Sequence, residues 1–221
     1  MTTPNPELLR AEFLGIAVRH REVTHDREQA ALLLAQHGQR FDLTRLEFAD
    51  GGATLSGASG TELVLRSTQT AVAGVTGLGF REGRTRVLAL LEEGLGQHVH
   101  DELWIEDITL VAVWDTEDPD GARRYLTDRV IGLDPERRAL LDEDDDAAEH
   151  GLRVWRRLGA GSLDCAIEPM HSDPDQIYIR LAYAQDEPVA NAAAVGACAD
   201  AVNDFLHGPL AAFVRAHTRD I

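Results

Sequence analysis

The last third of the chain alternates between hydrophobic and polar positions with a period of two. The alternation runs through residues 151–158, 162–170 and 176–184, and a turn-rich stretch separates the last two segments. This period predicts β-strands with one buried and one solvated face. The predicted buried face comprises Leu152, Val154, Leu163, Cys165, Ile167, Ile177, Ile179 and Leu181. The opposite face carries charged and aromatic side chains, so the sheet is expected to be covered on one side only.

The first hundred residues predict a strand, a helix, several antiparallel strands and a second helix. Residues 12–20 form the first strand, and Asp26 caps a helix that should end at Gly38. The dipeptide Asp50-Gly51 lies between two strand-like segments and predicts a tight hairpin. The outward side chains of these strands are predicted to be charged: Arg45, Glu47, Glu62 and Arg66.

The same order begins again halfway along the chain. Residues 108–115 predict a strand, and Pro119 stands at the first position of a capped helix. The three alternating strands follow, and a long helix from Pro188 is expected to be kinked or broken at Pro209. Each half therefore has the order strand, helix, antiparallel strands, helix.

This repeated order predicts an α+β fold in which a curved, mainly antiparallel sheet carries helices on one face. The two halves, residues 1–100 and 101–221, are expected to form one compact unit. The segments "GIAVRH" and "LVAVWD" align across the halves, with Ala17 over Ala112. In element order the chain resembles the duplicated sheet of the TATA-binding-protein-like superfold. The resemblance implies an architecture and no function, because fold likeness does not transfer function.

The strand at residues 108–115 is apolar on both alternations. If it aligns with the first half, Leu110, Ala112 and Trp114 lie on the open face and give it an apolar centre. Tryptophan, tyrosine and arginine dominate binding hot spots, so the open face is a predicted recognition surface. Its predicted partner-binding residues are Trp114, Arg153, Trp155, Arg157, Tyr178 and Arg180.

A simpler interpretation of Trp155 needs no partner. Arg153 and Arg157 would pair with Asp164 and Glu168 across strands, and Trp155 would rest on the arginine stems. Single exposed apolar residues are common on protein surfaces, so the sequence leaves both interpretations open.

Charge and composition narrow the partner classes. The formal net charge of −17 opposes sequence-independent binding to nucleic acid and favours a basic protein partner or a homodimer. All 21 basic residues are arginines, which fits a GC-rich genome. The absence of lysine excludes a Walker-type phosphate loop, a pyridoxal enzyme and a protein kinase. The sequence contains neither a signal peptide nor an apolar run of 18 residues, so we expect a cytoplasmic protein with no membrane contact.

Few residues suggest catalytic or metal chemistry. His98 and His100 are candidate metal ligands, but they follow a predicted helix at residues 84–97 and no third ligand is specified. We therefore predict a solvated helix end, with no metal and no cofactor. Cys165 and Cys198 have no neighbours at metal-site spacing and are predicted to be small core residues.

Two functions remain. The first is a non-catalytic binding protein, such as an adaptor, an immunity protein or a secretion chaperone, that uses the open sheet face for a protein partner or for a second copy of itself. The alternative is a small-molecule binder or enzyme with a pocket between the sheet and the alanine-rich C-terminal helix.

Overall fold

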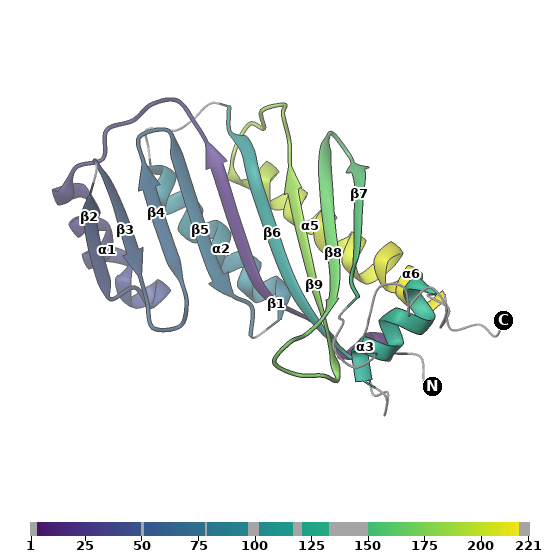
Figure 1. The fold of residues 1–221 in the computed structure, drawn as a ribbon. Helices are drawn as coiled ribbons and strands as arrows, with labels where there is room; N and C mark the ends of the chain where they lie inside the picture. The colour runs from purple at the N-terminus through teal and green to yellow at the C-terminus, as the bar shows by residue number, and fades with distance from the viewer. Residues whose placement is uncertain are drawn as a thin grey trace.

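The computed structural model describes residues 4–49, 51–77, 79–96, 102–116, 121–132 and 150–216. Within these residues nine strands form one antiparallel sheet in the order β2-β3-β4-β5-β1-β6-β9-β8-β7 (Figure 1). The strands are β1 (Leu9–Arg19), β2 (Arg45–Ala49), β3 (Gly52–Ser56), β4 (Glu62–Arg66), β5 (Gln69–Val75), β6 (Trp104–Asp115), β7 (Leu152–Leu158), β8 (Gly161–Pro169) and β9 (Gln176–Ala184). The α+β prediction is thus confirmed.

The described residues also form α-helices. They are α1 (Arg27–Phe41), α2 (Phe80–Leu95), α3 (Gly121–Tyr125), α5 (Ala192–Phe205) and α6 (Ala211–Ala216). Figure 1 shows α1, α2 and α5 behind the sheet, and we call the opposite face, toward the viewer, the open face. None of the described helices combines the length and the apolar character needed to span a bilayer.

The strand order is similar in the two halves, but four meander strands follow β1 and three follow β6. In each half the first strand pairs with the last strand of the following meander, β1 with β5 and β6 with β9. The two first strands then pair with each other and join the halves at the middle of the sheet. A common origin of the halves, and the division at residue 100, stay predictions.

The first helix begins as predicted but ends later. Asp26 caps it, because its side chain accepts a hydrogen bond of 2.7 Å from the Gln29 amide. The end predicted at Gly38 is wrong: the helix continues to Phe41 and is capped by Asp42 with φ 58°. Gly38 instead allows a close approach of the chain, since a Cβ there would lie 2.9 Å from the Leu43 carbonyl oxygen.

Helix α5 packs closely on the elements beneath it. A Cβ at Gly196 would lie 2.6 Å from Leu88 Cδ1 on α2, so the small residues of α5 serve close packing. At the predicted kink or break near Pro209, the helix changes to a π-helical segment at Leu206–Leu210 and then continues as α6, so it is irregular but not interrupted. Cys165 is buried in the core, as predicted, and this burial raises the pKa of its thiol to about 12.

Candidate functional site

The open sheet face is the first candidate site, and it carries most of the predicted residues. Arg153, Trp155 and Arg157 of β7 lie on it, as do Tyr178 and Arg180 of β9. The alternate positions of these strands, such as Leu163 and Ile179, are buried against the helices. Trp155 is 66% exposed. The predicted placement of these five residues is confirmed, and their role in binding stays a prediction.

Trp114 does not belong to this face. Its placement there is wrong, because the side chain is fully buried and its indole Nε1 donates a hydrogen bond of 2.8 Å to the Asn5 carbonyl oxygen. It pairs with Ile177, whose side chain belongs to the core. The physical reason is that β6 has apolar side chains at both its odd-numbered and its even-numbered positions. Its sequence therefore does not show which set faces the helices and which set faces outward. Val111 and Val113 take the outward positions instead, opposite Arg180 and Tyr178.

The alignment of Ala17 with Ala112 misplaced β6 because these two residues lie on opposite faces of the sheet. The register between β1 and β6 shifts between Ala11 and Phe13 and again between Ala17 and Val18. Paired residues nevertheless share a face on both sides of each shift. Ala17 pairs with Asp107 and faces outward, and alternation along β6 from Asp107 places Ala112 on the buried face.

Small side chains create a hollow in the open face. Gly15 pairs with Ala73, and Ala17 pairs with Ala71, where β1 and β5 run side by side. We call this depression the sheet hollow; its volume is about 230 Å³. Its lining comprises Phe13, Gly15, Ile16, Ala17, Glu62, Val64, Ala71, Val72, Ala73, Asp107 and Thr109. Sequence reasoning missed the hollow, although "TAVAGV" shows small residues at alternate positions.

A half-buried carboxylate lies at the edge of the sheet hollow. Burial raises the pKa of Asp107 above its usual range, and two groups oppose this shift. The Thr109 hydroxyl donates a hydrogen bond to the carboxylate, and the positive charge of Arg180 favours its ionised form. The hollow thus offers an apolar floor with an acidic group at its rim.

The raised pKa of Asp107 predicts how Asp107→Asn changes stability with pH. The folded chain favours the protonated form of Asp107, so this carboxyl stabilises the fold at pH values below its pKa in the unfolded chain. This contribution is lost as pH rises through the pKa of Asp107 in the folded chain. We therefore expect the stability of Asp107→Asn, relative to the unsubstituted chain, to increase between about pH 3 and pH 7. Urea unfolding at several pH values measures this trend.

Asp164→Asn is the matched control of opposite sign. The hydrogen bond from Arg153 lowers the pKa of Asp164, so ionisation of this carboxyl stabilises the folded chain above its unfolded pKa. Relative to the unsubstituted chain, Asp164→Asn should lose stability over the same rise in pH. Trends of the same sign in both variants would contradict the assignment.

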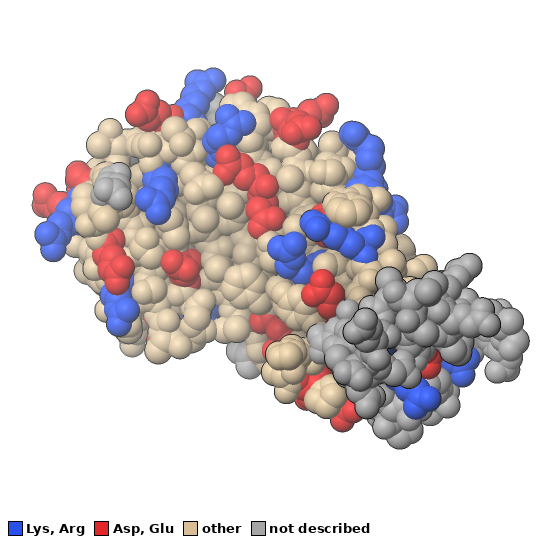
Figure 2. Space-filling model, in the orientation of Figure 1, with Lys and Arg blue, Asp and Glu red and all other residues tan. Residues whose placement is uncertain are grey.

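Several charged side chains of the open face are paired within the chain. Arg153 forms two hydrogen bonds to Asp164, of 2.9 and 2.6 Å, and its guanidinium lies 4.7 Å from the centroid of the Trp155 ring. The predicted pairing of Arg153 with Asp164 is therefore confirmed, and Trp155 nonetheless stays exposed. Arg10 similarly contacts Asp115 at 2.9 Å. Figure 2 shows acidic and basic groups interspersed around uncharged surface, so this face does not concentrate the net negative charge.

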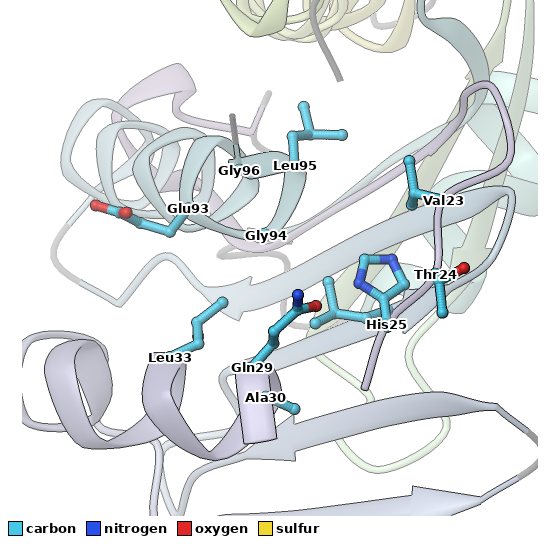
Figure 3. Close-up of a pocket in the computed structure, with 11 residues that line it drawn as sticks. Val23, Thr24, His25, Gln29, Ala30, Leu33, Glu93, Gly94, Leu95 and Gly96 are labelled. Atoms are coloured by element: carbon cyan, nitrogen blue, oxygen red, sulfur yellow. The ribbon is translucent and has the colours of Figure 1, made fainter. Parts of the chain in front are cut away.

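A second candidate site lies on the helical side, between α1 and α2 (Figure 3). The cleft has a volume of about 560 Å³, within the ordinary range of small-molecule pockets. Its lining comprises Val23, Thr24, His25, Gln29, Ala30, Leu33, Leu65, Glu93, Gly94, Leu95 and Gly96. Glu93 is held by His37 at 3.5 Å and by Arg40 at 3.3 Å. The cleft is therefore distinct from the predicted pocket beside the C-terminal helix.

The candidate metal ligands His98 and His100 lie outside the described residues. Within the described ranges no three histidine, cysteine or acidic side chains are grouped so that they could hold a metal ion.

Comparison with known proteins adds no functional assignment. No protein-family model matches the sequence, and no curated protein matches it significantly.

Proposed function

We propose that this chain is a non-catalytic binding protein that holds a protein on its open sheet face. The observation that carries the proposal is the sheet hollow, an apolar depression of about 230 Å³ on the same uncovered face as the 66% exposed Trp155. An aromatic or aliphatic anchor that fills a pocket is the usual core of a protein interface.

The rim of the face supports the same function. Its ion pairs are already formed before a partner arrives, so their side chains are partly ordered and lose less entropy on binding. Further apolar surface adjoins the hollow, since Val75 is 51% exposed and pairs with Phe13. The paired rim charges favour a partner with mixed charges over a strongly basic one.

Site-specific photo-crosslinking in cells that make the protein tests this proposal. A benzophenone amino acid at Val75 lies on the open face, and one at Leu32, 55% exposed on α1, is the control on the helical side. We expect a defined cross-linked protein from position 75 only. Equal or absent products at the two positions would refute the role of the open face.

The cleft between α1 and α2 supports a second candidate function, the binding of a small molecule. Its apolar floor and the polar groups of His25, Gln29 and Glu93 are the usual composition of such a site. Native mass spectrometry of protein purified from the producing cells should then detect a bound compound. The compound should be absent from Gln29→Trp, which fills the cleft. If neither the unsubstituted chain nor Gln29→Trp carries a bound compound, small-molecule binding in this cleft is refuted.

We also infer that the two halves arose by duplication and share the TATA-binding-protein-like architecture. The inference is supported by the pairing of the first strand of each half with the last strand of its meander, and by the helices α2 and α5 that follow the meanders.

A further inference from the structure

We propose that the protein held on the open face is a second copy of this chain, in a two-fold dimer in which Trp155 of each protomer fills the sheet hollow of the other. This inference rests on the proposed function and names its partner. It is argued from the sheet register, the strand order, the size of the hollow and the charges around it.

Trp155 and the sheet hollow lie in the same row of the sheet. The row of paired residues runs across the strands from β7 to β4 through Trp155, Asp164, Ala182, Thr109, Gly15, Ala73 and Glu62. The protruding indole is therefore at one end of the row and the hollow near the other. All of these side chains point to the open face, because directly paired residues share a face.

The strand order lets one symmetry axis make both contacts at once. An axis parallel to the strands and between β6 and β9 places β7 opposite the partner's β5, β8 opposite its β1, and β9 opposite its β6. Rotation about an axis parallel to the strands does not change the height of a residue along the strand direction. Trp155 and Ala73 belong to the same row, so each Trp155 comes to lie over the partner's Ala73. The contact is isologous, as closed dimers require. Two twisted sheets pack face to face in this aligned way at a spacing of about 10 Å.

The hollow is large enough for an aromatic side chain. Its volume is about 230 Å³, and a cavity of roughly 150 Å³ is enough to hold a benzene molecule. Gly15, Ala17, Ala71 and Ala73 would contact the indole ring with small side chains.

Charges around the two features are complementary. Arg153 and Arg157 flank Trp155 on β7, whereas Glu62 and Asp107 line the hollow. In the dimer Arg153 and Arg157 lie opposite the partner's β5, between Glu62 on β4 and Asp107 on β6, at each end of the interface. This local match offsets part of the repulsion between two chains that each carry a net charge of −17.

Light scattering and sedimentation equilibrium test the dimer. The unsubstituted chain should have twice the chain mass at micromolar concentration. Trp155→Ala, which removes the indole, and Ala73→Arg, which fills the hollow, should each weaken the dimer at least about tenfold. Thr54→Arg is the matched control: it places the same side chain on the open face of β3, which lies outside the overlap of the two sheets. It should leave the dimer unchanged. Thermal unfolding of each variant confirms that it is folded.

A mixture of the two weakened variants gives the sharpest result. Each variant alone lacks both contacts, but a heterodimer has one intact contact, between the Trp155 of Ala73→Arg and the hollow of Trp155→Ala. Mixing should therefore restore association above that of either variant alone. A mixture that associates no better than its components overturns the inference.

The outcomes separate this inference from the proposed function. A chain that stays monomeric, or a dimer that Trp155→Ala and Ala73→Arg do not weaken, overturns the dimer. If the photo-crosslinker at Val75 still captures a different protein, the proposed function stands without the dimer. If that position gives no specific product, both fail.

Discussion

Trp114→Ala is expected to lower the free energy of unfolding by about 3–5 kcal/mol, the range for deletion of a fully buried aromatic side chain. Trp114 has no exposed surface and lies where β6 meets the core, so its removal leaves a large cavity. The substitution also removes the hydrogen-bond donor of the Asn5 carbonyl oxygen, which ties the N-terminal segment to the sheet. Urea unfolding followed by circular dichroism measures the loss.

Trp155→Ala is the matched control, because the residue type and the change are the same. Trp155 is 66% exposed and its main contact is the Arg153 guanidinium, so the substitution should cost less than about 1 kcal/mol. The measurement is made at a concentration low enough to keep the chain monomeric. Equal losses from the two variants would contradict the assignment of these residues to opposite faces of the sheet.

Gly57→Ala should be the other strongly destabilising substitution, with a loss of about 3 kcal/mol or more from overpacking. A Cβ at this position would overlap the Asp42 carbonyl oxygen, which is backbone and has little freedom to move. The backbone of Gly57 is itself held, since its amide donates a hydrogen bond of 2.9 Å to the Thr61 carbonyl oxygen. The clash would therefore separate the β3–β4 connection from the end of α1.

Gly60→Ala, in the same connection, is the control for Gly57→Ala. Gly60 has a positive φ of 77°, but a Cβ added to it would have no other atom within 4 Å. Its substitution should cost only about 1–2 kcal/mol, from the left-handed backbone conformation. The midpoints of urea unfolding should fall in the order unsubstituted chain, Gly60→Ala, Gly57→Ala. A reversed order would contradict the close approach at Gly57.

The faces of the last three strands could be predicted from the sequence because one face is apolar and the other charged. Leu163, Cys165 and Ile167 alternate along β8 with Asp164 and other non-core positions. A slip of one residue in strand pairing would move these three apolar side chains to the open face, so only one register buries them. The repeated element order and the open face follow from the same alternation.

The middle of the sheet could not be predicted in this way. β6 is apolar on both sides, so its sequence does not show which of its residues face the helices. The burial of Trp114 further depends on Asn5, which is distant in sequence. The sheet hollow depends on which strands are neighbours: Ala73 meets Gly15 only because β5 returns to pair with β1.

Hydroxyl-radical footprinting tests the central claim, that the open face is the binding surface, most directly. Oxidation of Trp155 is compared with that of Phe213, which is 37% exposed on α6, in dilute purified protein and in cells that make it. We expect a lower ratio of Trp155 to Phe213 oxidation in cells, and a lower ratio in concentrated than in dilute purified protein if the partner is a second copy. An unchanged ratio under all conditions would show that the open face stays in water and binds no partner.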